Sequence, residues 1–219
     1  MNVKATFVAV SGLLACGLAV AGTIQVGGMA AGANGQISSK AGVCTVDFNA
    51  ASALNLCGAT YSESGGLPLN AAHFRTGNSS VAVSPAGDTT TYLAVGPSHG
   101  TPVTVTLANP ANYFGFYAGS LDDYNTVQFF LNGVLVDSFN GTDINSVVFP
   151  NSSANGLVSA FVDYFPGSLY TSIVYASTGN AFETDNHAFG LATPAGVPEP
   201  TSTALLGLGL LLLARRRRA

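Results

Sequence analysis

Alternation of apolar and polar residues with a period of two dominates the central part of the chain. At residues 102–107, three aliphatic side chains alternate with two threonines, which gives a strand one apolar face and one hydroxylated face. At residues 126–140, the pair Asn132-Gly133, typical of a type I′ turn, separates two apolar runs and predicts a β-hairpin. Further strands are predicted at residues 43–48, 80–83, 91–95, 113–117, 146–149, 157–165, 172–176 and 181–190.

These short strands are separated by Gly, Pro, Asn and Asp, and helical periodicity is nearly absent among them. The pattern predicts an all-β fold in which residues 42–191 form one antiparallel β-sandwich, jelly-roll-like in its arrangement. Residues 22–41 are rich in Gly, Ala and Ser, and they are either a flexible arm or a first strand. The domain is flanked by a signal-peptide helix and by a short C-terminal transmembrane helix.

The N-terminal 21 residues have the layout of a secretory signal peptide. Lys4 precedes an apolar stretch at residues 5–20, and Ala19 and Ala21 form an A-x-A cleavage site before Gly22. We therefore expect export through the Sec translocon and cleavage after Ala21. An alternative is lipidation of Cys16, since residues 13–17 resemble a lipobox, although Leu14 is larger than the residue usual at that place.

The C-terminal segment, residues 192–219, combines a linker with a short apolar helix and a basic end. Pro198 and Pro200 interrupt any helix around Glu199, and seven leucines follow in the uncharged stretch from Ala204 to Ala214. As a helix, residues 201–214 would span roughly 21 Å, less than the roughly 30 Å of a bilayer core. The cluster formed by Arg215, Arg216, Arg217 and Arg218 would stop transfer and stay on the cytoplasmic side.

This tail resembles the PEP-CTERM sorting signal of Gram-negative bacteria that produce exopolysaccharide. The resemblance implies that Val197, Pro198, Glu199 and Pro200 form the recognition motif of an exosortase, which removes the tail in the membrane. It further implies a protein anchored transiently in the inner membrane and then placed at the cell surface or outside the cell. Residues 114–129, 87–96 and 179–189 resemble a family of exosortase-dependent surface proteins with β-sandwich bodies, for which no activity is implied.

Charge and cysteine content agree with an extracellular body. Residues 22–196 contain two basic and ten acidic side chains, a net charge of −8, which excludes a footprint for nucleic acid. Once the signal peptide is removed, Cys44 and Cys57 are the remaining cysteines, and in an oxidising compartment they are expected to form a disulfide.

The residues give little support to an enzyme. His73, His99 and His187 stand apart in the sequence, no catalytic motif accompanies them, and we expect them to be surface or loop residues. Calcium is the cofactor that the sequence allows, because Asp47, Glu183, Asp185 and Asn186 would supply oxygen ligands if the first and last strands pair. A second acidic candidate is the loop at Asp122 and Asp123, which otherwise simply begins a turn.

Three functions remain in view at this point. The first is an exported, exosortase-processed structural or adhesive protein associated with extracellular polysaccharide. The second is a lectin-like, carbohydrate-binding module, with calcium as an optional ligand, in which exposed tyrosines stack on sugars. The tyrosines considered are Tyr113, Tyr117, Tyr124, Tyr164 and Tyr170, which would otherwise pack in the core. The third, a secreted hydrolase, is disfavoured because no pair of opposing carboxylates is evident.

Overall fold

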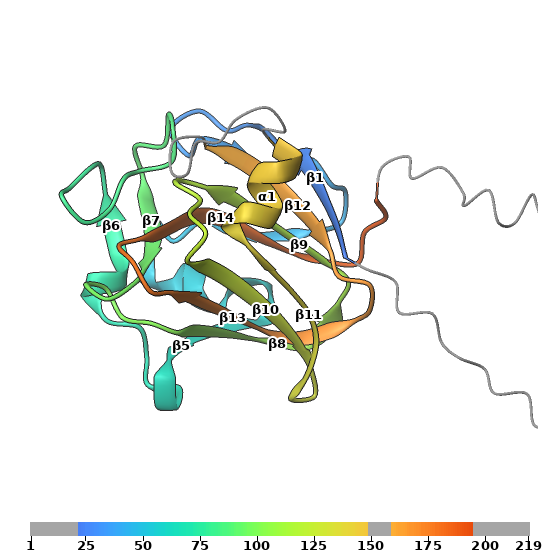
Figure 1. Cartoon of the computed structure of the whole chain (residues 1–219). Coiled ribbons are helices and arrows are strands. Elements are labelled where there is room, and N and C mark those ends of the chain that lie inside the picture. Colours follow the sequence, from blue (N-terminus) through green and yellow to red (C-terminus); the bar gives the residue numbers. More distant parts are fainter. Residues whose placement is uncertain (1–21, 149–158, 195–219) are drawn as a thin grey trace, which may run out of the picture.

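The computed structural model of the chain describes residues 22–148 and 159–194 and places two large antiparallel sheets face to face (Figure 1). The larger sheet has the order β1-β12-β9-β14-β7-β6, with β4 also paired to β14, and the smaller has the order β11-β10-β13-β8-β5. The strands of the larger sheet are β1 (Thr23–Gly27), β4 (Cys44–Val46), β6 (Phe74–Thr76), β7 (Thr91–Val95), β9 (Tyr113–Ala118), β12 (Ala160–Phe165) and β14 (Phe182–Gly190). Those of the smaller sheet are β5 (Ala59–Glu63), β8 (Val103–Ala111), β10 (Asn125–Leu131), β11 (Val134–Asn140) and β13 (Tyr170–Ser177).

Short elements complete the described part of the chain. A two-stranded ribbon joins β2 (Met29–Ala30) to β3 (Gln36–Ile37), and helix α1 (Gly141–Val148) packs against β1 and β11. Three 3-10 segments lie at η1 (Ala51–Gly58), η2 (Ser64–Gly66) and η3 (Ala71–His73). The predicted all-β, antiparallel character is confirmed, and the two facing sheets give a sandwich-like arrangement.

The core between the two sheets is built from the inward-facing residues of the alternating strands. Val103 and Val105 of β8 pack there with aromatic side chains such as Phe114, Phe116 and Phe129, and all five are fully buried. The rings meet at centroid distances of 5.1 Å for Phe114 with Phe116 and 6.0 Å for Phe114 with Phe129. Burial of this apolar and aromatic surface is the main stabilising contribution to the fold.

Strand β9 is buried on both of its faces, which explains its run of apolar residues. Phe114 and Phe116 point into the main core, whereas Tyr113 and Tyr117 belong to a second cluster with Phe161 of β12. This second cluster lies on the outer face of the larger sheet, where Gly28 and Gly35 approach Phe161 and Tyr117 closely. The segment after β1 therefore covers a face of the sheet that would otherwise be exposed.

Several predicted elements are confirmed and two are wrong. The hairpin is present as β10 and β11, with Asn132 and Gly133 both at positive φ, as a type I′ turn requires. Residues 80–83 contain no strand, and residues 146–148 belong to α1 rather than to a strand. The helix forms because the Asn140 side chain accepts the Asp143 N–H at 3.0 Å while Asp143 accepts the Asn140 N–H at 2.8 Å, a reciprocal cap that overrides the β-branched residues behind it.

The N-terminal part of the body is fixed by strand pairing and by a disulfide. Within the ambiguous segment 22–41, Thr23–Gly27 forms strand β1 against β12. The predicted disulfide Cys44–Cys57 is confirmed, with a Cα–Cα distance of 5.4 Å. In residues 22–148 and 159–194, no helix has the length and apolar character needed to cross a membrane. The predicted signal-peptide helix, the cleavage residues Ala19 and Ala21, the C-terminal helix and the motif at residues 197–200 and 215–218 lie outside the described residues.

Candidate functional site

Three of the four residues nominated for calcium, Asp47, Asp185 and Asn186, lie near the junction of strands β4 and β14. Val46 of β4 pairs with His187 of β14, so Asp47 follows the edge strand close to Asp185 and Asn186, as the sequence predicted. The electrostatic influence of Asp47 on Asp185 reflects this proximity. The residue in direct hydrogen-bonding reach of Asp185, however, is Asp88, which the sequence analysis did not nominate.

Asp88 and Asp185 form a buried pair of carboxyl groups. Asp88 is 5% exposed and Asp185 is fully buried. One oxygen of Asp88 accepts the Thr90 N–H at 2.8 Å and the Thr90 hydroxyl at 2.7 Å, and one oxygen of Asp185 accepts the Asn186 N–H at 2.7 Å. Among the described residues, no donor reaches Oδ2 of either aspartate. Each aspartate therefore keeps one buried oxygen without a hydrogen-bond partner among the described residues.

Asn186 adds a third buried oxygen beside this pair. Its Nδ2 donates to the carbonyl oxygens of Asn34 at 2.6 Å and Gln36 at 2.9 Å, which ties β14 to the ribbon β2–β3. Its Oδ1 is buried and meets no donor within the described part of the chain. The residue has a φ of 53°, a left-handed conformation that Asn tolerates better than most residues, and it sits in the bulge between Asp185 and Ala188.

Glu183 has partners of its own and does not complete a ligand set. Its two carboxylate oxygens accept the Val83 N–H at 2.8 Å and the Ser120 hydroxyl at 2.7 Å. In residues 22–148 and 159–194, no three His, Cys, Asp or Glu side chains are arranged to hold a metal ion. Asp47, Glu183 and Asp185 thus do not form a three-carboxylate site, and a cation at this place would depend on Asp88, Asp185 and neutral oxygens.

The electrostatics of the pair favour a proton on Asp185. Burial, and after it the neighbouring Asp88, together raise the pKa of Asp185 from 3.8 to about 10. Because two adjacent carboxylates in an apolar setting cannot both ionise cheaply, a proton on Asp185 can be shared with Asp88. A bound cation would remove the need for this proton.

The prediction that His73, His99 and His187 are exposed at the surface is wrong, because all three side chains are buried. His187 lies in the main core, where Nδ1 meets the Tyr61 hydroxyl at 2.9 Å and Nε2 meets the Thr184 hydroxyl at 2.8 Å. Burial lowers the pKa of His187 to about 3, so the ring is neutral. Neutral imidazole and hydroxyl groups satisfy one another there, which lets a polar residue replace an apolar one inside the sandwich.

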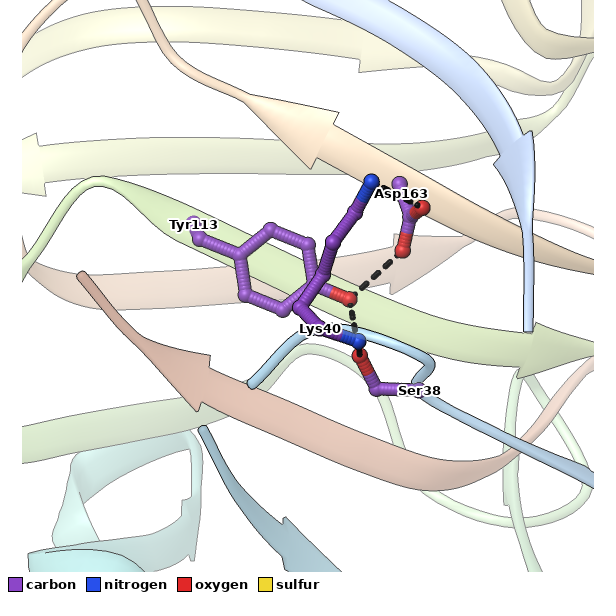
Figure 2. Close-up of polar contacts among 4 residues, drawn as sticks. All are labelled: Ser38, Lys40, Tyr113 and Asp163. Carbon is purple, nitrogen blue, oxygen red and sulfur yellow. Dashed lines mark hydrogen bonds and ion pairs between the residues drawn. The ribbon is translucent and has the colours of Figure 1, made fainter. Parts of the chain in front are cut away.

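A second polar network fastens the segment after β3 to the outer face of the larger sheet (Figure 2). The Tyr113 hydroxyl donates to Oδ1 of Asp163 at 2.6 Å and lies 2.7 Å from the Ser38 hydroxyl. Lys40 places Nζ 3.2 Å from Oδ2 of Asp163 and 5.5 Å from the centre of the Phe165 ring. Asp163 is 1% exposed, so this ion pair compensates a buried charge and is a structural contact.

The other candidate groups have structural roles. Asp122 begins a turn, because its carbonyl oxygen accepts the Asn125 N–H at 3.0 Å. Tyr113, Tyr117, Tyr164 and Tyr170 are at most 2% exposed and offer no face to a sugar, whereas Tyr124 is partly exposed. Asp88 was missed because its role depends on the loop that brings residues 85–88 over β9, where Ala86 accepts a hydrogen bond from Tyr117. The sequence carried no signal of that placement beyond the Gly87-Asp88 turn.

Comparison with known proteins identifies the C-terminal segment. Residues 196–218 match the PEP-CTERM protein-sorting motif. No curated protein and no solved structure matches the chain. The motif implies export, transient anchoring in a membrane and processing by an exosortase, and the family of the all-β body is not identified by these matches.

Proposed function

We propose that this chain, which ends in a PEP-CTERM sorting motif, is a structural or adhesive protein of the cell surface that acts within extracellular polysaccharide. The motif at residues 196–218 is the observation that carries the proposal. The body supports it: one disulfide between Cys44 and Cys57, few charged residues and many hydroxyl and amide side chains suit an oxidising, hydrated matrix. Export begins with the Sec signal peptide at residues 1–21, and the jelly-roll-like arrangement of the body belongs to the same proposal.

Processing is tested by expressing the full chain in an exopolysaccharide-producing bacterium with and without its exosortase. We expect the wild-type protein to lose its tail and reach the surface or the medium. Without the enzyme, or with Glu199→Ala, the uncut chain should stay in the membrane fraction. Thr193→Ala, an exposed linker change outside the motif, is the matched control. Unchanged processing in the strain that lacks the exosortase would refute this part of the proposal.

The role in the matrix requires a separate measurement. Processed protein is mixed with polysaccharide purified from the same strain, and co-sedimentation is compared with that of an unrelated disulfide-containing β protein. Binding to the whole polymer together with silence on an array of defined oligosaccharides supports a structural or adhesive role. Strong binding to one oligosaccharide would instead favour the lectin-like alternative. In that case Tyr124 is the first residue to replace, because four of the five candidate tyrosines are buried.

Calcium is proposed as a ligand of the body at the Asp88–Asp185 pair. Three buried oxygens that lack donors among the described residues, on Asp88, Asp185 and Asn186, support this placement. The ion would replace the proton on Asp185 and would be structural, because both carboxyl groups of the pair are buried. The melting temperature in millimolar calcium against that in EDTA tests the proposal, and equal values would remove calcium from it.

A further inference from the structure

The first described residue, Gly22, lies against two polar side chains of the body. A Cβ atom built on Gly22 would be 2.1 Å from the Tyr164 hydroxyl oxygen and 2.4 Å from Oδ2 of Asp137. The backbone nitrogen is about 2.5 Å from that Cβ position, so it lies within about 5 Å of Oδ2. Strand β1 begins at the next residue, Thr23, and pairs with β12, which fixes the place of this nitrogen.

A cavity of about 370 Å³ surrounds this position and is negatively charged. Its lining includes the carboxylates of Asp137 and Asp143 and the hydroxyl groups of Ser138, Ser146 and Tyr164. None of the described residues that line it is Lys, Arg or His. The two basic side chains at residues 22–194 lie elsewhere: Lys40 pairs with Asp163, and Arg75 is in strand β6 and does not line the cavity.

Asp137 is held in place by neutral donors. Its Oδ1 accepts the Ser138 N–H at 2.9 Å and its Oδ2 accepts the Gly167 N–H at 3.3 Å. The Tyr164 hydroxyl also donates a hydrogen bond to Asp137. Burial, and after it the interaction with Asp137, raise the pKa of this hydroxyl, so it stays protonated and remains a donor. These contacts orient the carboxylate and leave its negative charge without a counter-charge.

We propose that this cavity binds the chain's own α-ammonium group, which appears when the precursor is cut between Ala21 and Gly22. The proposal rests on the proposed export and on that cleavage site. Hydrolysis consumes one water molecule, leaves a carboxylate on Ala21 and leaves an amine on Gly22, which takes up a proton. Before the cut, the Gly22 nitrogen is an uncharged amide, so the ion pair with Asp137 exists only in the mature protein.

The identity of residue 22 fits this role. A side chain there would force the Tyr164 hydroxyl and the Asp137 carboxylate to move, since both lie within 2.4 Å of the Cβ position. Glycine lets the terminal nitrogen approach the carboxylate without such a shift. The alternative maturation at Cys16 would leave six further residues before Gly22 and would place no ammonium in this cavity. The cavity thus favours the cut after Ala21.

The test uses protein exported from the full precursor and begins with its mass and N-terminal sequence. The α-amino pKa of Gly22 is then measured by NMR with labelled glycine. We expect it above the ordinary range of about 7.7–8.0, and back within that range in Asp137→Asn. Asp123→Asn, an exposed acid outside the cavity, is the matched control and should leave the value unchanged. Asp143→Asn provides a second variant, with a smaller expected decrease, if Asp137→Asn does not fold.

Stability gives an independent readout. A precursor with one extra alanine between Ala21 and Gly22 yields a mature chain whose ammonium is displaced by one residue. Because pairing raises the α-amino pKa, its contribution is complete below about pH 7.7 and is lost as the pH rises through the folded value. We expect the natural chain to melt about 2–4 °C higher at about pH 6.5, and the two chains to melt together at about pH 10.

The outcomes separate this inference from the function on which it rests. A mature N-terminus other than Gly22 overturns both the predicted cleavage site and the ammonium site. A Gly22 terminus with an ordinary α-amino pKa, or with the same value in Asp137→Asn, overturns the ammonium site alone and leaves sorting and export intact.

Discussion

Replacing Asp185 with asparagine tests how the buried Asp88–Asp185 pair is compensated. Asparagine has the shape of aspartate, keeps an oxygen for the Asn186 N–H and places an amide group beside Asp88, whose Oδ2 has no donor among the described residues. The substitution removes the ionisable group with little change in packing, because Asp185 is fully buried. We expect Asp185→Asn to be more stable than the wild-type protein above pH 7.

The size of the effect follows from the pKa of Asp185, which is raised from 3.8 to about 10. Between these values the folded chain holds a proton that the unfolded chain has released, so stability falls as the pH rises. The slope is about 1.4 kcal/mol per pH unit, and the advantage of Asp185→Asn should grow by about 3 kcal/mol between about pH 7 and about pH 9. The lowered pKa of His187 gives a slope of opposite sign below about pH 6.5, which both proteins share.

The measurement is urea unfolding of both proteins in EDTA at three pH values within that window, with linear extrapolation to water. Asp123→Asn is the control for loss of one negative charge, because Asp123 is exposed, and its pH profile should run parallel to that of the wild-type protein. A difference between Asp185→Asn and wild type that does not change with pH would show that Asp185 is ionised in the folded chain. The assignment of a proton to this pair would then be wrong.

Four further tests probe other parts of the structure. Millimolar calcium should raise the melting temperature of the wild-type protein but not that of Asp185→Asn, and EDTA should reverse the rise. The double change of Cys44 and Cys57 to alanine opens a loop whose ends are 13 residues apart and should lower the free energy of unfolding in urea by about 3 kcal/mol. Tyr113→Phe removes the hydroxyl donor to the buried Asp163 and should lower the free energy of unfolding by about 1–3 kcal/mol. Lys40→Met should lower it by more, about 3 kcal/mol or above, because the buried carboxylate of Asp163 then has no cation beside it. Urea unfolding measures both effects.

Sequence reasoning succeeded where the signal is local. The Asn132-Gly133 turn, the alternation in residues 102–107 and the even pair of cysteines each require only nearby residues, and the structure contains the corresponding hairpin, strand and disulfide. It failed at residues 146–148, where β-branched residues suggested a strand. There, the reciprocal cap between Asn140 and Asp143 starts a helix.

The candidate site could be predicted only in part, because it depends on contacts between distant segments. Pairing of β4 with β14 placed Asp47 near Asp185 as expected. The partner Asp88 comes from a loop whose course no local pattern encodes, and a bulge after Asp185 shifts the register of β14 against β9. The burial of His187 depends on hydroxyl partners from Tyr61 and Thr184, which the sequence leaves indistinguishable from other tyrosines and threonines.

An acidic body with so few basic side chains must compensate its buried carboxylates in other ways. Lys40 forms an ion pair with Asp163, and the other basic residue of the body, Arg75, lies in edge strand β6. The pKa of Asp185, raised to about 10, indicates a proton as its compensation, which the proposed calcium would replace. Asp137, beside Gly22, would gain the α-ammonium group that maturation creates. The acids Asp163, Asp185 and Asp137 thus draw on different positive groups, and the two proposed ones, calcium and the new terminus, become available only as the protein is exported.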